Sequence, residues 1–122
     1  MTAEEVLRER RRAHRLTRRI IRFLKESWAW EIRLLPLQTD RRLLKKLGFD
    51  SPIVGVTMET ERVIGIDPAY EDFFAVLIHE CLHAIEPQID EKGILALETQ
   101  VRKHLTPYYA KHLLIWASKR LR

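Results

Sequence analysis

The fold of this chain is decided by the stretch VLIHECLHAI, residues Val76–Ile85. Residues i and i+4 of a helix lie on the same face, so His79 and His83 can present ring nitrogens to one metal ion, at the distance zinc prefers. Glu80 lies about 100° around the helix from His79, within reach of a water on that ion without binding the ion itself. The spacing therefore predicts a metal site with a carboxylate base beside it.

The residues around the two histidines are those of a buried helix. Apolar side chains precede His79, the residues after Glu80 other than His83 are uncharged, and no proline interrupts the stretch. Cys81 points roughly opposite His79 and is expected in the core rather than in the metal site. The alternative to a metal site is a core helix whose two histidines are satisfied by hydrogen bonds.

Composition predicts one soluble domain, residues 1–122, with 46% hydrophobic and 32% charged residues. No apolar run approaches the roughly 18 residues of a membrane span, so no membrane association is expected. The polar, Arg-rich beginning has no apolar signal core and the chain has a single cysteine. Both features favour a reducing, cytoplasmic location. The absence of Asn and the abundance of charge hint at a thermophilic source.

The order of elements predicts an α+β fold with a small sheet of about three strands on one side of the helices. Hydrophobic periodicity and capping residues place the helices, and β-branched content places the strands. The expected helices cover residues 2–29, 40–47, 70–86, 91–105 and 107–121. The expected strands cover residues 31–35, 53–59 and 62–67.

The third metal ligand must come from outside the motif helix, because a catalytic zinc has three protein ligands. Glu98 is the first candidate, since it falls within the apolar stripe of the next helix, where an unpaired carboxylate is costly. A salt bridge to Arg102, four residues on, is the alternative explanation of that carboxylate. His104 and Glu91 are held in reserve, and Glu86 stands on the same helix axis as His83 and would close a tetrahedron poorly.

With these residues the chain resembles a family, the gluzincin zinc peptidases. The His-Glu-x-x-His helix followed by a second helix with Glu98 is their arrangement, and the small size looks most like the single-domain minigluzincins. The resemblance is specific over residues 76–105 and only topological before them. It implies a zincin-like minimal domain that binds Zn²⁺ through His79, His83 and Glu98.

The resemblance also implies an activity, with Glu80 as general base and acid in the hydrolysis of a peptide or protein substrate. It favours an endopeptidase over an exopeptidase, and it implies that a strand within residues 53–67 walls the cleft and pairs with extended substrate. Some members of such families are latent because a terminal segment fills the cleft. The first and last helices are the candidates for that segment here.

One position departs from the family. Gluzincins often place an Asp four residues after the ligand Glu, where it orients a histidine ligand; here that position is Arg102. Asp72 or Asp90 would then have to supply the orienting group. The oxyanion donor is equally open, and the candidates at the start of the last helix are Tyr108, Tyr109 and His112.

A second hypothesis, from a different class, rests on the charge of the chain. The formal net charge is +5, and one face of the first helix is strongly basic. This face predicts either a solvated surface or a nucleic-acid contact. In a variant of this hypothesis the protein is SprT-like, a DNA-directed protease with a third histidine in place of Glu98. Oligomeric state is left open.

Overall fold

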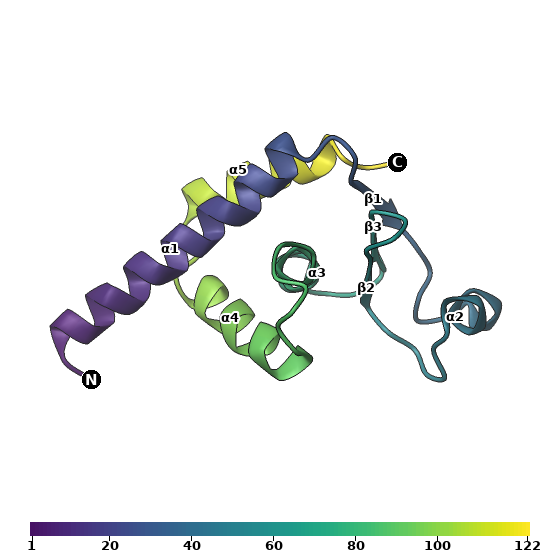
Figure 1. Ribbon diagram of the computed structural model, residues 1–122, viewed down its shortest axis with the longest axis horizontal. Helices are drawn as coiled ribbons and strands as arrows, with labels where there is room; N and C mark the ends of the chain where they lie inside the picture. The colour runs from purple at the N-terminus through teal and green to yellow at the C-terminus, as the bar shows by residue number, and fades with distance from the viewer.

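The computed structural model describes all residues, 1–122, as a small α+β domain of five helices and a three-stranded sheet (Figure 1). The expected order of elements is confirmed. The elements are α1 (Ala3–Glu26), β1 (Glu31–Leu34), α2 (Arg41–Leu47), β2 (Gly55–Met58), β3 (Val63–Ile66), α3 (Phe73–Ile85), α4 (Glu91–Lys103) and α5 (Pro107–Ser118).

Helix α3 lies at the centre of the molecule, between the other long helices and the sheet (Figure 1). Its sequence is apolar on most sides, as expected of a helix that is covered on all sides but one. Leu77, Ile78, Cys81 and Leu82 have no exposed surface, so the core position predicted for Cys81 is confirmed. The central helix therefore places the histidine motif deep in the domain, with only one side open.

The sheet has the strand order β1-β3-β2. Strand β3 lies in the middle, parallel to β1 and antiparallel to β2, with Thr57 opposite Ile64 in the register. All four residues of β3 are buried, which fits its β-branched sequence. Strand β2 packs against α3 and leaves one edge unpaired. That free edge borders the motif helix.

Every helix begins at a side-chain cap. Four of the expected starts are confirmed to within one residue, whereas α3 begins at Phe73, after its cap Asp72, instead of at residue 70. In each case the oxygen of a Thr or Asp accepts a backbone N–H three residues on. The capping residues are Thr2, Asp40, Asp72, Asp90 and Thr106. Gly48 ends α2 in the left-handed conformation, with φ of 87°, as expected for a glycine at that position.

The structure corrects the ends of several predicted elements. Helix α1 stops at Glu26 instead of residue 29, and Trp28, which the predicted helix included, lies beyond its end, is 84% exposed and packs against Arg120. Strands β2 and β3 are four residues each, shorter than expected. None of the helices combines the length and apolar character that crossing a bilayer requires.

Candidate metal centre

The two histidines of the motif lie on the open side of α3, facing the first turn of α4. Nε2 of His79 is 2.6 Å from Oε1 of Glu91, and Nε2 of His83 is 2.8 Å from Oε2 of the same carboxylate. The candidate ligand atoms of these three residues all lie within 4.8 Å of one another. One carboxylate thus joins the two imidazoles, and His79, His83 and Glu91 form a group that could hold a metal ion.

The chain reversal between α3 and α4 explains why Glu91 reaches this position. The start of α3 contacts the end of α4 through Asp72 and Arg102, so the turn between the helices brings the start of α4 to the end of α3. Glu91, the first residue of α4, therefore lies level with His83 near the end of α3. Its side chain is 62% exposed, so its carboxylate has room to move.

Glu98 lies two turns further along α4 and meets the other nitrogen of His79. Its Oε1 is 2.8 Å from Nδ1, and its Oε2 accepts a hydrogen bond from Nη1 of Arg102 at 3.3 Å. The carboxylate is buried, as the sequence predicted, and the salt bridge to Arg102 weighed as the alternative is present. The structure does not bring Glu98 into the group formed by His79, His83 and Glu91.

Arg102 extends this network to the beginning of the motif helix. Its Nη2 donates to Oδ2 of Asp72 at 2.6 Å, while Oδ1 of Asp72 accepts the N–H of Ala75 as the helix cap. Asp72, considered as the group that orients a histidine, therefore acts on His79 only through Arg102 and Glu98. Asp90, the other candidate, caps α4 instead.

The donor set fits a divalent cation. A neutral imidazole carries one N–H, yet both ring nitrogens of His79 face a carboxylate oxygen, so one of the two contacts needs either a second ring proton or a cation between its atoms. If Glu98 accepts the proton on Nδ1, the lone pair of Nε2 faces the Glu91 side, where a metal ion would bind. The Glu91 carboxylate is exposed and could move enough to admit an ion between it and the two imidazoles.

Glu80 is held on the sheet side of α3, against strand β2. Its Oε1 lies 2.9 Å from the hydroxyl of Thr57, which also lies 2.8 Å from the backbone carbonyl of Glu80. A Cβ on Gly55 would approach Oε2 and Cγ of Glu80 to 3.0 Å and Cγ1 of Val76 to 2.5 Å. Only glycine at this position lets the strand come so close to the carboxylate.

Burial raises the pKa of the Glu80 carboxyl above its ordinary value, and the hydrogen bond from Thr57 opposes this shift. The nearby imidazoles also lower the pKa, and the charge of Glu91 raises it. Burial beside two histidines, with a raised pKa, is the environment expected of a carboxyl group that transfers protons.

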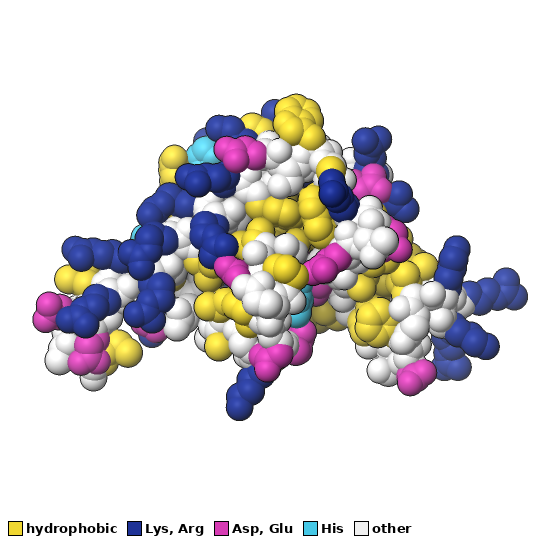
Figure 2. Space-filling view, viewed as in Figure 1, with side chains coloured by type: hydrophobic (Ala, Val, Ile, Leu, Met, Phe, Trp, Pro, Cys, Tyr) yellow, Lys and Arg dark blue, Asp and Glu magenta, His cyan; other side chains and the backbone are white.

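An open cavity of about 830 Å³ lies over these residues, between β2 and α4. In Figure 2, magenta acidic side chains and a cyan histidine are visible beside this hollow. Its apolar walls come from the segment before β2, from β2 itself and from α4, and Tyr70 is the tyrosine in its lining. The volume is in the range of ligand-binding clefts. No residue of α1 or α5 lines it, so neither terminal helix fills the cleft as latency would require.

Other residues considered from the sequence lie away from this cavity. Nε2 of His104 is 3.2 Å from Glu9 on α1, and Tyr109 accepts a hydrogen bond from Arg18. Tyr108 is 66% exposed, and its ring packs against His112. The structure therefore brings no histidine other than His79 and His83 to the cavity, and none of the three expected oxyanion donors.

Thr57 and Gly55 were missed by sequence reasoning. A threonine in a strand has no signal that separates a contact to a carboxylate from ordinary strand content. A glycine within a strand can indicate a close approach of another group, and this was the available signal for Gly55.

Comparisons of the chain with protein-family models, with curated proteins and with solved structures gave no match.

Proposed function

We propose that this protein is a zinc-dependent hydrolase that cleaves peptide bonds, in a zincin-like minimal domain. The observation that carries the proposal is the convergence of His79, His83 and both oxygens of Glu91 beside the buried carboxylate of Glu80. Two imidazoles and two carboxylates at the floor of an open cleft are the groups that metal-assisted hydrolysis requires.

In this proposal the two glutamates of α4 have different roles. Glu91 is the third zinc ligand, although the sequence favoured Glu98 and held Glu91 in reserve. Glu98 accepts the Nδ1 proton of His79 and fixes the ring so that Nε2 faces the ion. Arg102 occupies the position where gluzincins often have an Asp. Here it forms an ion pair with Glu98 and so stabilises the carboxylate that orients His79.

A bound zinc ion would polarise the substrate carbonyl and lower the pKa of a water molecule towards neutrality. Glu80 then acts as general base, taking a proton from the attacking water and delivering it to the leaving amine. Thr57 holds Oε1 of Glu80 by a hydrogen bond, and the close approach of Gly55 fixes the other oxygen, Oε2, in place. The base is therefore positioned before substrate arrives.

The free edge of β2 supports a peptide as the substrate. Gly55, Val56 and Thr57 all line the cavity, and the outer edge of β2 has no partner strand. An extended peptide can add to such an edge by main-chain hydrogen bonds, which brings its carbonyl groups past Glu80. Binding along a strand favours cleavage within a chain over removal of terminal residues.

Hydrolysis of a peptide library by the zinc-loaded protein, followed by mass spectrometry, tests this function. We expect cleavage by the wild type, loss of cleavage after chelation, and recovery on adding zinc. Glu80→Gln should still bind zinc but lose at least 100-fold in rate. Cleavage that survives chelation, or equal cleavage by Glu80→Gln, would contradict the proposal.

A further inference from the structure

The charge of this protein is concentrated in one helix. Helix α1 holds nine Arg and Lys residues against four Glu, while the rest of the chain holds thirteen of each sign. The whole net charge of +5 therefore resides in α1. This concentration lies apart from the metal centre, because no residue of α1 lines the cavity over His79 and His83.

The cations of α1 form a continuous basic stripe on the face opposite the core. Its members recur at intervals of three and four residues, so they share one side of the helix. All are exposed, and dark blue side chains follow α1 along its length (Figure 2). The basic stripe consists of Arg8, Arg11, Arg12, Arg15, Arg18, Arg19, Arg22 and Lys25.

Few of these charges are neutralised within the chain. Arg8 pairs with Glu4 at 3.5 Å and Arg19 with Glu86 at 2.6 Å, and the other members of the stripe form no ion pair. Like charges at these helical spacings repel one another and destabilise the helix. On a face exposed only to solvent this repulsion stays unfavourable, whereas a bound polyanion would offset the repulsion between the cations.

The stripe also borders a groove. This hollow of about 550 Å³ lies between α1 and the segment formed by α4 and the turn before it. One side is lined by five arginines of the stripe and Leu16, and the other by Glu86, Ile89 and Leu97.

The cations of α1 are almost all arginine. Of the nine cations in α1, eight are Arg, whereas the rest of the chain has seven Arg and six Lys. Arg binds phosphate with two parallel hydrogen bonds and is the residue suited to recognising phosphate groups.

We propose that the basic stripe binds the sugar–phosphate backbone of a nucleic-acid duplex, without reading its bases. The stripe extends over about 25 Å of helix, a length over which a duplex carries about 15 phosphate charges. The aromatic rings that contact the stripe, Tyr109 at Arg18 and Trp116 at Lys25, are half-buried in α5 and so offer little open surface for unstacked bases, which favours a duplex over a single strand.

The structure argues against the other polyanionic partners. A helix that lies on a membrane must insert its apolar face, but the apolar face of α1 is buried in the core through Ala13, Leu16, Ile20 and Leu24. A protein interface needs exposed apolar anchors at its centre, whereas the apolar residues of the groove, Leu16, Ile89 and Leu97, are buried or half-buried. Regularly spaced phosphates are the partner that matches regularly spaced guanidinium groups.

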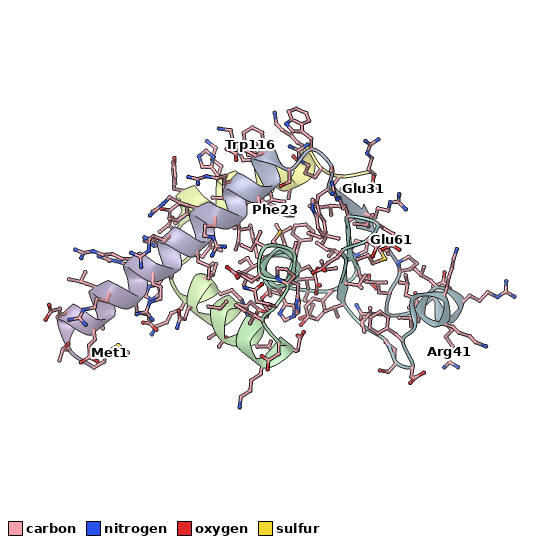
Figure 3. All side chains as sticks on the ribbon, viewed as in Figure 1. Met1, Phe23, Glu31, Arg41, Glu61 and Trp116 are labelled. Atoms are coloured by element: carbon pink, nitrogen blue, oxygen red, sulfur yellow. The ribbon has the colours of Figure 1, made fainter.

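The test is fluorescence anisotropy with labelled DNA and RNA duplexes of 20 base pairs over a range of NaCl concentrations. The test variant replaces Arg11, Arg15 and Arg22 by Ala, which favours helix and removes no ion pair of the chain. The control variant removes the same charge from α2 by replacing Arg41, Arg42 and Lys46 by Ala. Arg41 lies at the opposite end of the molecule from Met1 (Figure 3).

For the wild type we expect binding to DNA, RNA or both, independent of base sequence, with log K falling linearly against log salt. The α1 variant should bind at least 10-fold more weakly at low salt, with a slope reduced by about 2–3, because each lost phosphate contact removes about 0.9. The α2 variant should stay within twofold of the wild type. Equal losses in both variants, or no binding to either duplex, would overturn the proposal.

Discussion

Gly55→Ala tests the proposed positioning of Glu80 by strand β2. The added methyl would lie 2.5 Å from Val76 Cγ1 and 3.0 Å from Glu80 Cγ and Oε2. Ordinary carbon contacts are about 3.5–4.0 Å, so the strand must move away from Val76 by at least about 1 Å and from the Glu80 side chain by about 0.5–1 Å. Overpacking of this size costs about 1–3 kcal/mol, a fall in Tm of about 4–15 °C for a domain of this length. A shift of about 1 Å in a catalytic group costs about 100-fold in rate.

The assay measures both quantities, Tm by thermal unfolding and kcat/KM on the best peptide from the library. Gly65→Ala is the matched control, because its methyl would lie 2.7 Å from Leu35 Cδ1 and 3.0 Å from Val56 Cγ1, in the same sheet but not against Glu80. It should lower Tm without a comparable loss of rate at temperatures where both variants are folded. If Gly55→Ala kept the wild-type rate, or if both variants lost rate equally, the reasoning about Glu80 would be refuted.

Three further outcomes follow from the packing and charges. Leu77→Ala empties a fully buried site in the central helix and should cost about 2–5 kcal/mol of unfolding free energy in a denaturant titration. The hydrogen bond from Arg19 lowers the pKa of Glu86, so the pair stabilises the fold above the ordinary carboxyl pKa and loses this effect as pH falls through the lower folded value. The Tm deficit of Arg19→Ala at pH 7 should therefore shrink below about pH 4, and a deficit that stays constant would contradict this sign. Burial raises the pKa of the Cys81 thiol, so a thiol reagent should label Cys81 only after denaturation, and rapid labelling of the native protein would refute its burial.

The parts of the fold that the sequence predicted well depend on local chemistry. Asp40 and Gly48 mark the two ends of α2, because a side-chain cap and a left-handed glycine each act within a few residues. Thr106 and Pro107 start α5 for the same reason. The burial of Glu98 was also predictable, because its place in an apolar stripe follows from helical periodicity alone.

The parts that the sequence did not predict depend on contacts between distant segments. Trp28 continued the apolar period of α1, but the helix ends before it, and the ring lies exposed against Arg120 from the end of the chain. Thr57 and Gly55 reach Glu80 only because β2 packs against α3. Such pairings depend on how strand and helix are docked, which no local pattern encodes.

The choice between Glu91 and Glu98 shows the same limit within the candidate site. Both carboxylates lie on α4, and periodicity separates a buried one from an exposed one. The proposed ligand position depends instead on where the turn between α3 and α4 places the first residue of α4 relative to His83. The exposed glutamate thus reaches the two Nε2 atoms, and the buried one reaches Nδ1 of His79.

Zinc binding measured by calorimetry in the wild type, Glu91→Ala and Glu98→Gln tests the central claim most directly. Glu61→Ala, outside the cavity lining, serves as the control. We predict one zinc per wild-type chain and unchanged affinity in the control. Glu98→Gln should lose about 10–100-fold as a positioning residue, and Glu91→Ala should lose more than that as a ligand. A wild type that binds no zinc, or a Glu91→Ala variant that binds it as tightly as the wild type, would contradict the account.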